Sequence, residues 1–179
     1  MAEKKNIILG VTASIAIYKS CEIIRQLQEK GLSVTVVMTA EAEELIRPVV
    51  FRSLTRNKVY TGMFQEPQAW EIEHISLAKK ADLVLVAPAT ANIIGKIANG
   101  ICDDLLTCVV MATSAPVLLA PAMNANMFRN KILQDNLNKL KAAGYKIIAP
   151  VEGKLACGDR GIGCLAPVEA IVKEVKRYL

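Results

Sequence analysis

Short apolar runs recur along the chain and alternate with longer segments in which apolar and polar residues are mixed. The runs consist mainly of Ile, Leu and Val, which is typical of strands buried on both faces of a parallel sheet. Three runs end in Ala-Pro, and because proline lacks a backbone N–H, we expect Pro88, Pro121 and Pro150 to end strands. The predicted strands are residues 6–11, 34–38, 83–87, 117–120 and 146–149.

The segments between the runs carry apolar residues at helical spacing. In the first segment, Ser14 is the expected N-cap and Gly31 ends the helix. Proline suits the first turn of a helix, so Pro48 is expected to restart one helix and Pro167 to begin the last. Helices are predicted from Ser14 to Gly31, over 40–57 with a break at Pro48, from 89–92 to about Asn99, after Asp103, over 131–142, and from Pro167 to the C-terminus.

Residues 58–73 and the segment around residues 102–108 need separate interpretation. Residues 58–73, which include Trp70, are the least regular part of the chain. Asp103 is expected to cap the helix that follows it. Cys102 and Cys108 have apolar neighbours and are expected to be packed.

The alternation of strands and helices with short connections predicts the fold class. It indicates a mostly parallel sheet with helices on both faces. We therefore predict one α/β domain over residues 1–179, with a Rossmann-like (flavodoxin-like) architecture. In such sheets ligands bind beyond the carboxyl ends of the strands.

Composition narrows the choice of partners. The chain has 179 residues, 53% hydrophobic and 4% aromatic, with a net charge of +5 and basic residues spread along its length. This favours small anionic ligands such as phosphates and carboxylates over nucleic acid. No apolar segment is long enough to span a bilayer and no signal peptide is evident, so a cytoplasmic location and no membrane partner are expected. Five cysteines without metal-ligand spacing predict neither a disulfide framework nor a metal site.

The turn after the first predicted strand can bind an anion through its backbone N–H groups. It carries Gly10, Thr12, Ala13 and Ser14, but not the three glycines of a dinucleotide-binding turn. A single phosphate, as on flavin mononucleotide (FMN), therefore suits it better. An ordinary strand-to-helix turn with a serine cap is the alternative.

Two further strand ends meet the same crevice. Thr39 follows the second strand, and residues 89–92 follow the third. Small side chains there would let a flat ring approach the backbone, while Asn92 could hydrogen-bond the ring. A simple N-cap at Thr90 is the alternative, and capping and binding can coexist. The segment consists of Ala89, Thr90, Ala91 and Asn92.

Three polar side chains suggest chemistry on a small acid. His74 is the only histidine, and imidazole is the side chain that titrates near neutral pH. Asn124 follows the fourth predicted strand and can hold a carboxylate without charge repulsion. Cys157 lies in 153–163, where four glycines predict a flexible flap that could close over a substrate. A structural histidine and an inert loop cysteine are the alternatives.

Together these residues resemble the homo-oligomeric flavin-containing cysteine decarboxylases. The resemblance covers nearly the whole chain, and the Pro-Ala-Met-Asn and Ala-Cys-Gly-Asp motifs are its most specific parts. The motifs are Val-Thr-x-Ser-Ile-Ala at 11–16, His-Ile at 74–75, Ala-Pro-Ala-Thr-Ala-Asn at 87–92, Asn-Gly-Ile-Cys-Asp-Asp-Leu-Leu at 99–106, Pro-Ala-Met-Asn-Ala-Asn-Met at 121–127, and Ala-Cys-Gly-Asp-x-Gly-x-Gly at 156–163.

The resemblance implies FMN-dependent oxidative decarboxylation of a cysteinyl substrate, with 4′-phosphopantothenoylcysteine of coenzyme A biosynthesis as the expected substrate. It implies that His74 is the base, that Asn124, with Met123 and Ala122, binds the substrate, and that Cys157 donates a proton in the final reduction. FMN would be bound by the 10–14 turn, Thr39 and residues 89–92. Members of the family are trimers or assemblies of trimers with active sites between subunits, and many bacterial ones continue into a phosphopantothenate-cysteine ligase domain.

The motifs depart from the family at Ala13, Phe128 and Cys164, where glycine, Trp or Tyr, and arginine are usual. Three other functions fit parts of the pattern. A peptidyl-cysteine decarboxylase would release an enethiol, which the presence of Cys157 argues against. A flavin prenyltransferase would lack the Pro-Ala-Met-Asn motif and the thiol. A non-catalytic regulatory relative would lack the histidine, asparagine or cysteine.

Overall fold

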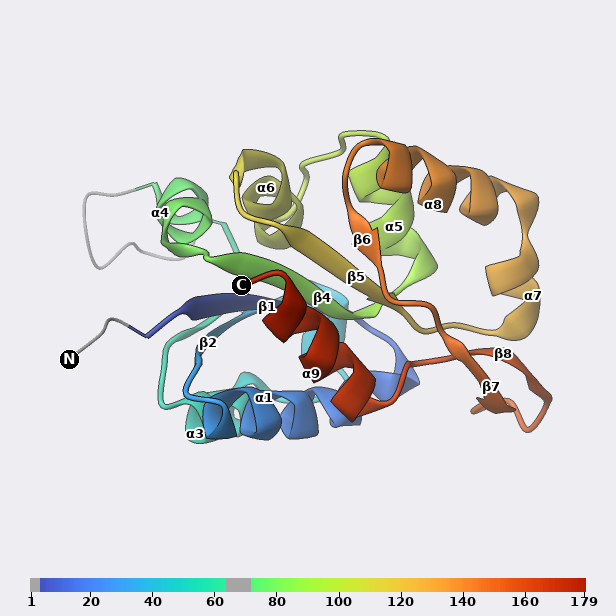
Figure 1. Ribbon diagram of the computed structural model, residues 1–179, viewed down its shortest axis with the longest axis horizontal. Coiled ribbons are helices and arrows are strands. Elements are labelled where there is room, and N and C mark those ends of the chain that lie inside the picture. Colours follow the sequence, from blue (N-terminus) through green and yellow to red (C-terminus); the bar gives the residue numbers. More distant parts are fainter. Residues whose placement is uncertain (1–3, 64–71) are drawn as a thin grey trace.

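The computed structural model describes residues 4–63 and 72–179, and Trp70 lies outside them. A six-stranded parallel sheet forms the centre, in the order β3-β2-β1-β4-β5-β6 (Figure 1). All five predicted strands are present. The strands of this sheet are β1 Asn6–Val11, β2 Ser33–Met38, β3 Val59–Tyr60, β4 Leu83–Ala89, β5 Val117–Pro121 and β6 Lys146–Ile147.

This strand order confirms the predicted fold class. It is the order of a Rossmann sheet, and without the two-residue edge strand β3 it becomes the flavodoxin order. The chain leaves β1 toward β2 on one side and later returns through β4 on the other. The crevice between the carboxyl ends of β1 and β4 is therefore the topological switch point at which such folds bind ligands.

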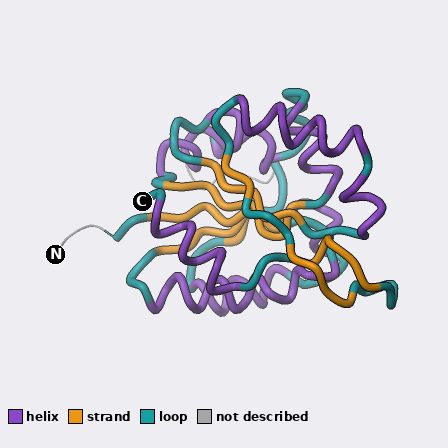
Figure 2. Tube along the Cα trace, turned by 45° about the vertical axis from the view of Figure 1, so that its right-hand side comes forward, coloured by secondary structure: helices purple, strands orange, loops and turns teal. Residues whose placement is uncertain are grey.

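Helices cover both faces of the sheet, as Figures 1 and 2 show. Ile7 and Leu9 of β1 pack with α1, α3 and α9, whereas Ile8 packs with α4, α5, α6 and α8. The period of two sends alternate side chains into two apolar cores. The helices of the described residues are η1 Ile15–Tyr18, α1 Lys19–Glu29, α2 Ala40–Glu43, α3 Pro48–Thr55, α4 Glu73–Lys80, α5 Ala91–Ala98, α6 Leu105–Ala112, α7 Ala125–Arg129, α8 Lys131–Ala142 and α9 Val168–Arg177.

The predicted strand ends need correction at two prolines. β4 does not end before Pro88 but continues through it to Ala89. Its register against β5 shifts between Val86 and Ala89, and a proline is tolerated where a ladder is interrupted in this way. The last predicted strand is only two residues long and ends before Pro150.

The glycine-rich segment after Pro150 was expected to be a flexible flap without packed structure, and this is wrong. It forms an antiparallel hairpin of β7 Val151–Lys154 and β8 Arg160–Cys164, which projects at the right of Figure 1. Helix α7 contacts β8. A Cβ at Gly161 would lie 2.9 Å from the Cβ of Ala125 on α7. The missing side chain thus permits close packing of the hairpin on α7.

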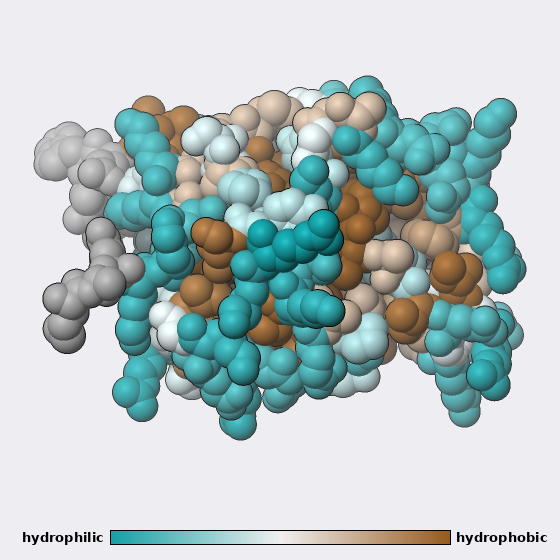
Figure 3. All heavy atoms as spheres, viewed as in Figure 1, coloured by the Kyte–Doolittle hydropathy of each residue, from teal (hydrophilic) through white to brown (hydrophobic). Residues whose placement is uncertain are grey.

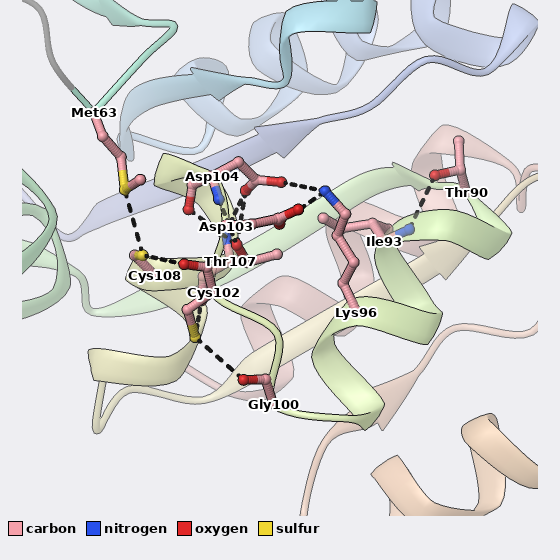
Figure 4. A network of polar contacts seen from close by, with 10 residues as sticks. All are labelled: Met63, Thr90, Ile93, Lys96, Gly100, Cys102, Asp103, Asp104, Thr107 and Cys108. Atoms are coloured by element: carbon pink, nitrogen blue, oxygen red, sulfur yellow. Dashed lines mark hydrogen bonds and ion pairs between the residues drawn. The ribbon is translucent and has the colours of Figure 1, made fainter.

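The expected cap of α6 is also wrong. Asp104, not Asp103, caps the helix, accepting a 2.8 Å bond from the N–H of Thr107. Figure 4 shows both carboxylates directed at Lys96, with Asp103 2.8 Å from its ammonium nitrogen. The hydrogen bond from Lys96 lowers the pKa of Asp103. Thr107 completes a capping box with Asp104, which explains why Asp104 and not Asp103 is the N-cap of α6.

The two cysteines beside this cap differ in exposure. Cys102 is exposed, so its expected packing is wrong, whereas Cys108 is partly buried. The thiol of Cys108 lies 3.5 Å from the sulfur of Met63 (Figure 4). Burial is the largest cause of a raised pKa at Cys108.

Candidate functional site

A cavity of about 560 Å³ opens at the switch point, between the segments that follow β1, β4 and β5 and the β7–β8 hairpin. Its walls combine small and apolar side chains with a few polar ones. The lining residues are Ala13, Ser14, Ile15, Ala16, Tyr18, Lys19, Thr90, Ala91, Ala122, Met123, Asn124, Met127, Lys154, Leu155, Ala156, Cys157, Gly163, Cys164 and Leu165.

The turn after β1 is fastened to the end of β4 by Thr12. Its hydroxyl donates to the carbonyl of Pro88 at 2.7 Å and accepts from the N–H of Thr90 at 3.2 Å. Thr12 is buried and does not line the cavity, so it positions the two walls. Ser14 does line the cavity and, as predicted, caps the helix that follows, which begins as the 3-10 turn η1.

The predicted cofactor residues at the end of β4 and the start of α5 divide into two groups. Thr90 and Ala91 line the cavity, and Thr90 also caps α5 by accepting from Ile93 N–H at 3.3 Å. Ala89 is fully buried, and Asn92 is absent from the described lining residues. Gly10 of β1 also lies outside the described lining. A Cβ at Gly10 would lie 2.5 Å from the side chain of Leu106, so the backbone is packed closely there. Gly10 therefore serves packing beneath the turn.

Thr39 has a feature that sequence reasoning could not show. Its N–H donates to the carbonyl of Val11 at 3.1 Å, so the residue lies beside the end of β1. Its hydroxyl is buried and has no hydrogen-bond partner among the described residues. An unpaired buried hydroxyl is costly, and a bound ligand group would satisfy it.

Asn124 is held by the helix that it begins. Its Oδ1 accepts from the N–H of Asn126 at 2.8 Å and caps α7, which leaves Nδ2 to face the cavity. That nitrogen donates to Cys157 Sγ at 3.5 Å. The predicted carboxylate holder and the predicted proton donor therefore meet in one cavity, although 33 residues separate them.

The hairpin reaches Asn124 through a close backbone contact. Met123 N–H donates to the carbonyl of Gly163 at 3.0 Å. A Cβ at Gly163, whose φ is +147°, would overlap the carbonyl oxygen of Met123. Only glycine permits this approach, which brings Cys157 to the cavity. The thiol is exposed there and donates to Asp159 Oδ2 at 3.5 Å.

His74 does not join the other predicted catalytic residues within one chain. It lies in the first turn of α4, is partly buried, and is absent from the described residues that line the cavity. Figure 1 shows α4 at the opposite end of the molecule from the hairpin that carries Cys157. Ile72, just before this helix, is 65% exposed.

Sequence reasoning missed several lining residues. Lys19 and Lys154 add positive charge, and Ile15, Tyr18 and Met127 add exposed apolar surface. Toward the end where α7 and the hairpin lie, Figure 3 shows apolar side chains exposed among hydrophilic ones. Helical spacing alone cannot identify these residues, because the cavity is formed by segments that are distant in sequence.

The fold and the position of the cavity define an α/β protein that binds a ligand at the switch point of its sheet. The chain belongs to the Flavoprotein family, whose model matches residues 1–179. It is 44% identical over 178 residues to the coenzyme A biosynthesis bifunctional protein CoaBC of Bacillus subtilis, covering 99% of this chain and 44% of that relative. It is 42% identical over 177 residues to a probable phosphopantothenoylcysteine decarboxylase of Streptococcus mutans, covering 98% of this chain and 99% of that one.

Solved structures agree with these relatives. A PPC decarboxylase mutant complexed with pantothenoylaminoethenethiol matches with a TM-score of 0.88 and 30% identity, over 98% of both chains. The FMN binding protein AtHal3 matches with a TM-score of 0.84 and 30% identity, over 98% of this chain and 97% of that one. The chain spans less than half the length of the bifunctional relative from B. subtilis and nearly all of the one from S. mutans.

Proposed function

We propose that this chain, as one flavoprotein domain, is an FMN-dependent decarboxylase that converts 4′-phosphopantothenoylcysteine to 4′-phosphopantetheine in coenzyme A biosynthesis. The 3.5 Å contact between the Asn124 amide and the Cys157 thiol carries this proposal, because it joins a carboxylate-binding group to a proton donor. The names of the relatives from B. subtilis and S. mutans support it. Cys157 favours a reductive last step over release of an enethiol.

The residues of the cavity fit FMN. The turn at Ala13 and Ser14 offers polar groups in the cavity, and Thr90 and Ala91 form a wall with little side-chain bulk. Thr39 is not among the described lining residues, but its buried, unpaired hydroxyl lies beside the end of β1 and offers a further polar group. These residues would hold the cofactor, with Gly10, Thr12, Ala89 and Asn92 supporting them. When bound, FMN supplies the two-electron oxidation of the cysteinyl thiol and later returns the electrons.

The protein's own groups bind the substrate and move protons. The Nδ2 of Asn124 donates to the substrate carboxylate, and Met123 and Ala122 form the adjacent wall. An imidazole nitrogen of His74 takes a proton as the thiol is oxidised. After CO₂ has left, Sγ of Cys157 gives a proton to a carbon of the enethiol that decarboxylation leaves, as this enethiol is reduced to the final product.

The active site in this proposal is shared between copies of the chain. His74 belongs to α4, far from the cavity of its own chain, so a second copy must bring it there. Exposed apolar residues at both surfaces support such contact: Ile15 and Tyr18 at the cavity are each 61% exposed, and Ile72 lies beside His74. We propose a trimer or an assembly of trimers, in which each contact completes one site.

One further partner, a second enzyme domain, belongs to the proposal. The bifunctional name of the B. subtilis relative, of which this chain covers 44%, supports a following phosphopantothenate-cysteine ligase domain in the full-length protein. No helix of the described residues is long and apolar enough to cross a membrane. The cytoplasmic location expected from the sequence stays a prediction.

The purified protein tests the proposed function directly. It should be yellow and, on denaturation, release FMN rather than FAD. With 4′-phosphopantothenoylcysteine it should release CO₂ and form 4′-phosphopantetheine, identified by mass spectrometry. A colourless protein that cannot be reconstituted with FMN would contradict the proposal, and an enethiol as the final product would assign the chain to the non-reducing decarboxylases.

A further inference from the structure

The cavity contains two lysines that have no part in the proton transfers. Lys19 is the first residue of α1 and Lys154 is the last residue of β7. They are the only charged side chains among the described lining residues, and both are positive. None of the ion pairs found among the described residues includes either of them.

The surroundings of these ammonium groups favour an anionic ligand. Ile15, Met127 and Leu155 contribute apolar surface to the same walls, and such walls strengthen the field of a nearby charge. A lysine ammonium binds phosphate as a compact point charge. No carboxylate among the described residues lines the cavity to compete for either lysine.

Two phosphates belong to the proposed reaction, one on the cofactor and one on the substrate. The cofactor phosphate is expected at the turn after β1. Lys154 instead lies three residues before Cys157, which limits their separation along the chain to about 11 Å. The substrate has its cysteinyl group at Cys157 and Asn124 and its phosphate at the other end of the pantothenoyl chain. This limit applies to the Cα atoms, and the flexible side chain of Lys154 can carry its ammonium group further from Cys157, toward the phosphate end of the substrate.

We propose that Lys154 and Lys19 bind the phosphate of the substrate from the two walls of the cavity and thereby select phosphorylated substrates. The proposal rests on the proposed function. Lys19 is half-buried and lies on the wall formed by the start of α1. Lys154 is itself exposed on the hairpin. Both positions leave the interior free for the cysteinyl end of the substrate.

The test compares substrates with and without phosphate in single variants. For Lys154→Gln, Lys19→Gln and the wild type, kcat/KM is measured with 4′-phosphopantothenoylcysteine and with pantothenoylcysteine. The ratio of the two values should fall about tenfold in each variant, as expected for loss of one charged hydrogen bond. Lys154→Arg should keep the ratio near that of the wild type. Lys173→Gln, an exposed lysine of α9, is the matched control and should not lower it.

Other outcomes separate the alternatives. An unaltered ratio in both glutamine variants would overturn the proposal. The proposal would also be overturned by a glutamine variant that binds FMN more weakly than the wild type, binds riboflavin as well as the wild type, and loses activity equally on both substrates. The lysine would then bind the phosphate of the cofactor and not that of the substrate. If the wild type decarboxylates neither substrate, the proposed function fails. Calorimetric binding of 4′-phosphopantetheine and pantetheine to the FMN-loaded variants then still decides whether the lysines recognise the phosphate.

Discussion

The position of His74 outside the cavity of its own chain predicts that two inactive variants restore each other's activity. His74→Asn removes the proposed base. Asn124→Asp places a carboxylate against the substrate carboxylate, and like charges at contact distance oppose binding. Each variant alone should therefore lack decarboxylase activity, although each should bind FMN, since neither residue belongs to the proposed cofactor contacts.

The expected recovery follows from the arrangement of chains in a ring. Every trimer that contains both variants has one contact at which a His74→Asn chain, with its intact Asn124, meets an intact His74 from its neighbour. One site in three is then complete, so mixed trimers should show about one third of the wild-type rate per bound FMN. Sites formed within single chains would give no recovery, because each chain lacks one of the two residues.

The assay uses co-expression of the two variants with different affinity tags, purification through both tags, and measurement of CO₂ release. A chain carrying both substitutions, processed in the same way, is the control and should be inactive. Absence of activity in doubly tagged oligomers that contain FMN would refute the shared site. Activity of the His74→Asn variant alone would refute the role of His74.

Three other predictions concern single positions. Cys157→Ser should still release CO₂ but accumulate the enethiol, seen by mass spectrometry, since serine is a weaker acid than a thiol; normal product would show that Cys157 is not the donor. Gly163→Ala should lower the free energy of unfolding, measured by urea titration, by about 3 kcal/mol, because the added methyl group would overlap the backbone of Met123. Gly31→Ala, where φ is +80° but the surrounding space is open, should lower it by about 1 kcal/mol. Equal losses would contradict the packing argument. The hydrogen bond from Lys5 lowers the pKa of Asp82, so the stability advantage over Asp82→Asn should be full at neutral pH and disappear as the pH falls below about 4; an advantage independent of pH would exclude this ion pair as its source.

The fold was largely predictable from the sequence because the apolar runs of buried parallel strands are strong local signals. The errors lie where tertiary contacts decide. β4 continues through Pro88 because the ladder with β5 is interrupted there. The hairpin of β7 and β8 has a glycine-rich sequence typical of a mobile loop, and it is ordered by pairing and by contact with α7. Neither the interruption of the β4–β5 ladder nor the packing of the hairpin produces a periodic pattern in the sequence.

The candidate site was predictable in its residue types but not in its assembly. Ser14, Thr90, Asn124 and Cys157 do line one cavity, as the motifs led us to expect. Whether a residue lines the cavity or supports it could not be predicted, because that depends on side-chain direction at the strand ends. The separation of His74 from the cavity depends on where the topology places α4. A motif along the chain does not contain that information.

The local geometry of Asn124 explains why its aspartate variant should fold normally and still fail. Asparagine and aspartate both cap helices well, so an aspartate oxygen can accept the 2.8 Å bond from Asn126 N–H and preserve α7. The cap also fixes the amide, with its acceptor turned to the helix and its donors to the cavity. An amide nitrogen has two N–H donors, and the bond to Cys157 uses one of them. The other is free for a substrate carboxylate, so one side chain can hold the departing group beside the thiol that protonates the product. A carboxylate at position 124 has no donors in its ionised form, and both of these contacts would be lost while the helix remained.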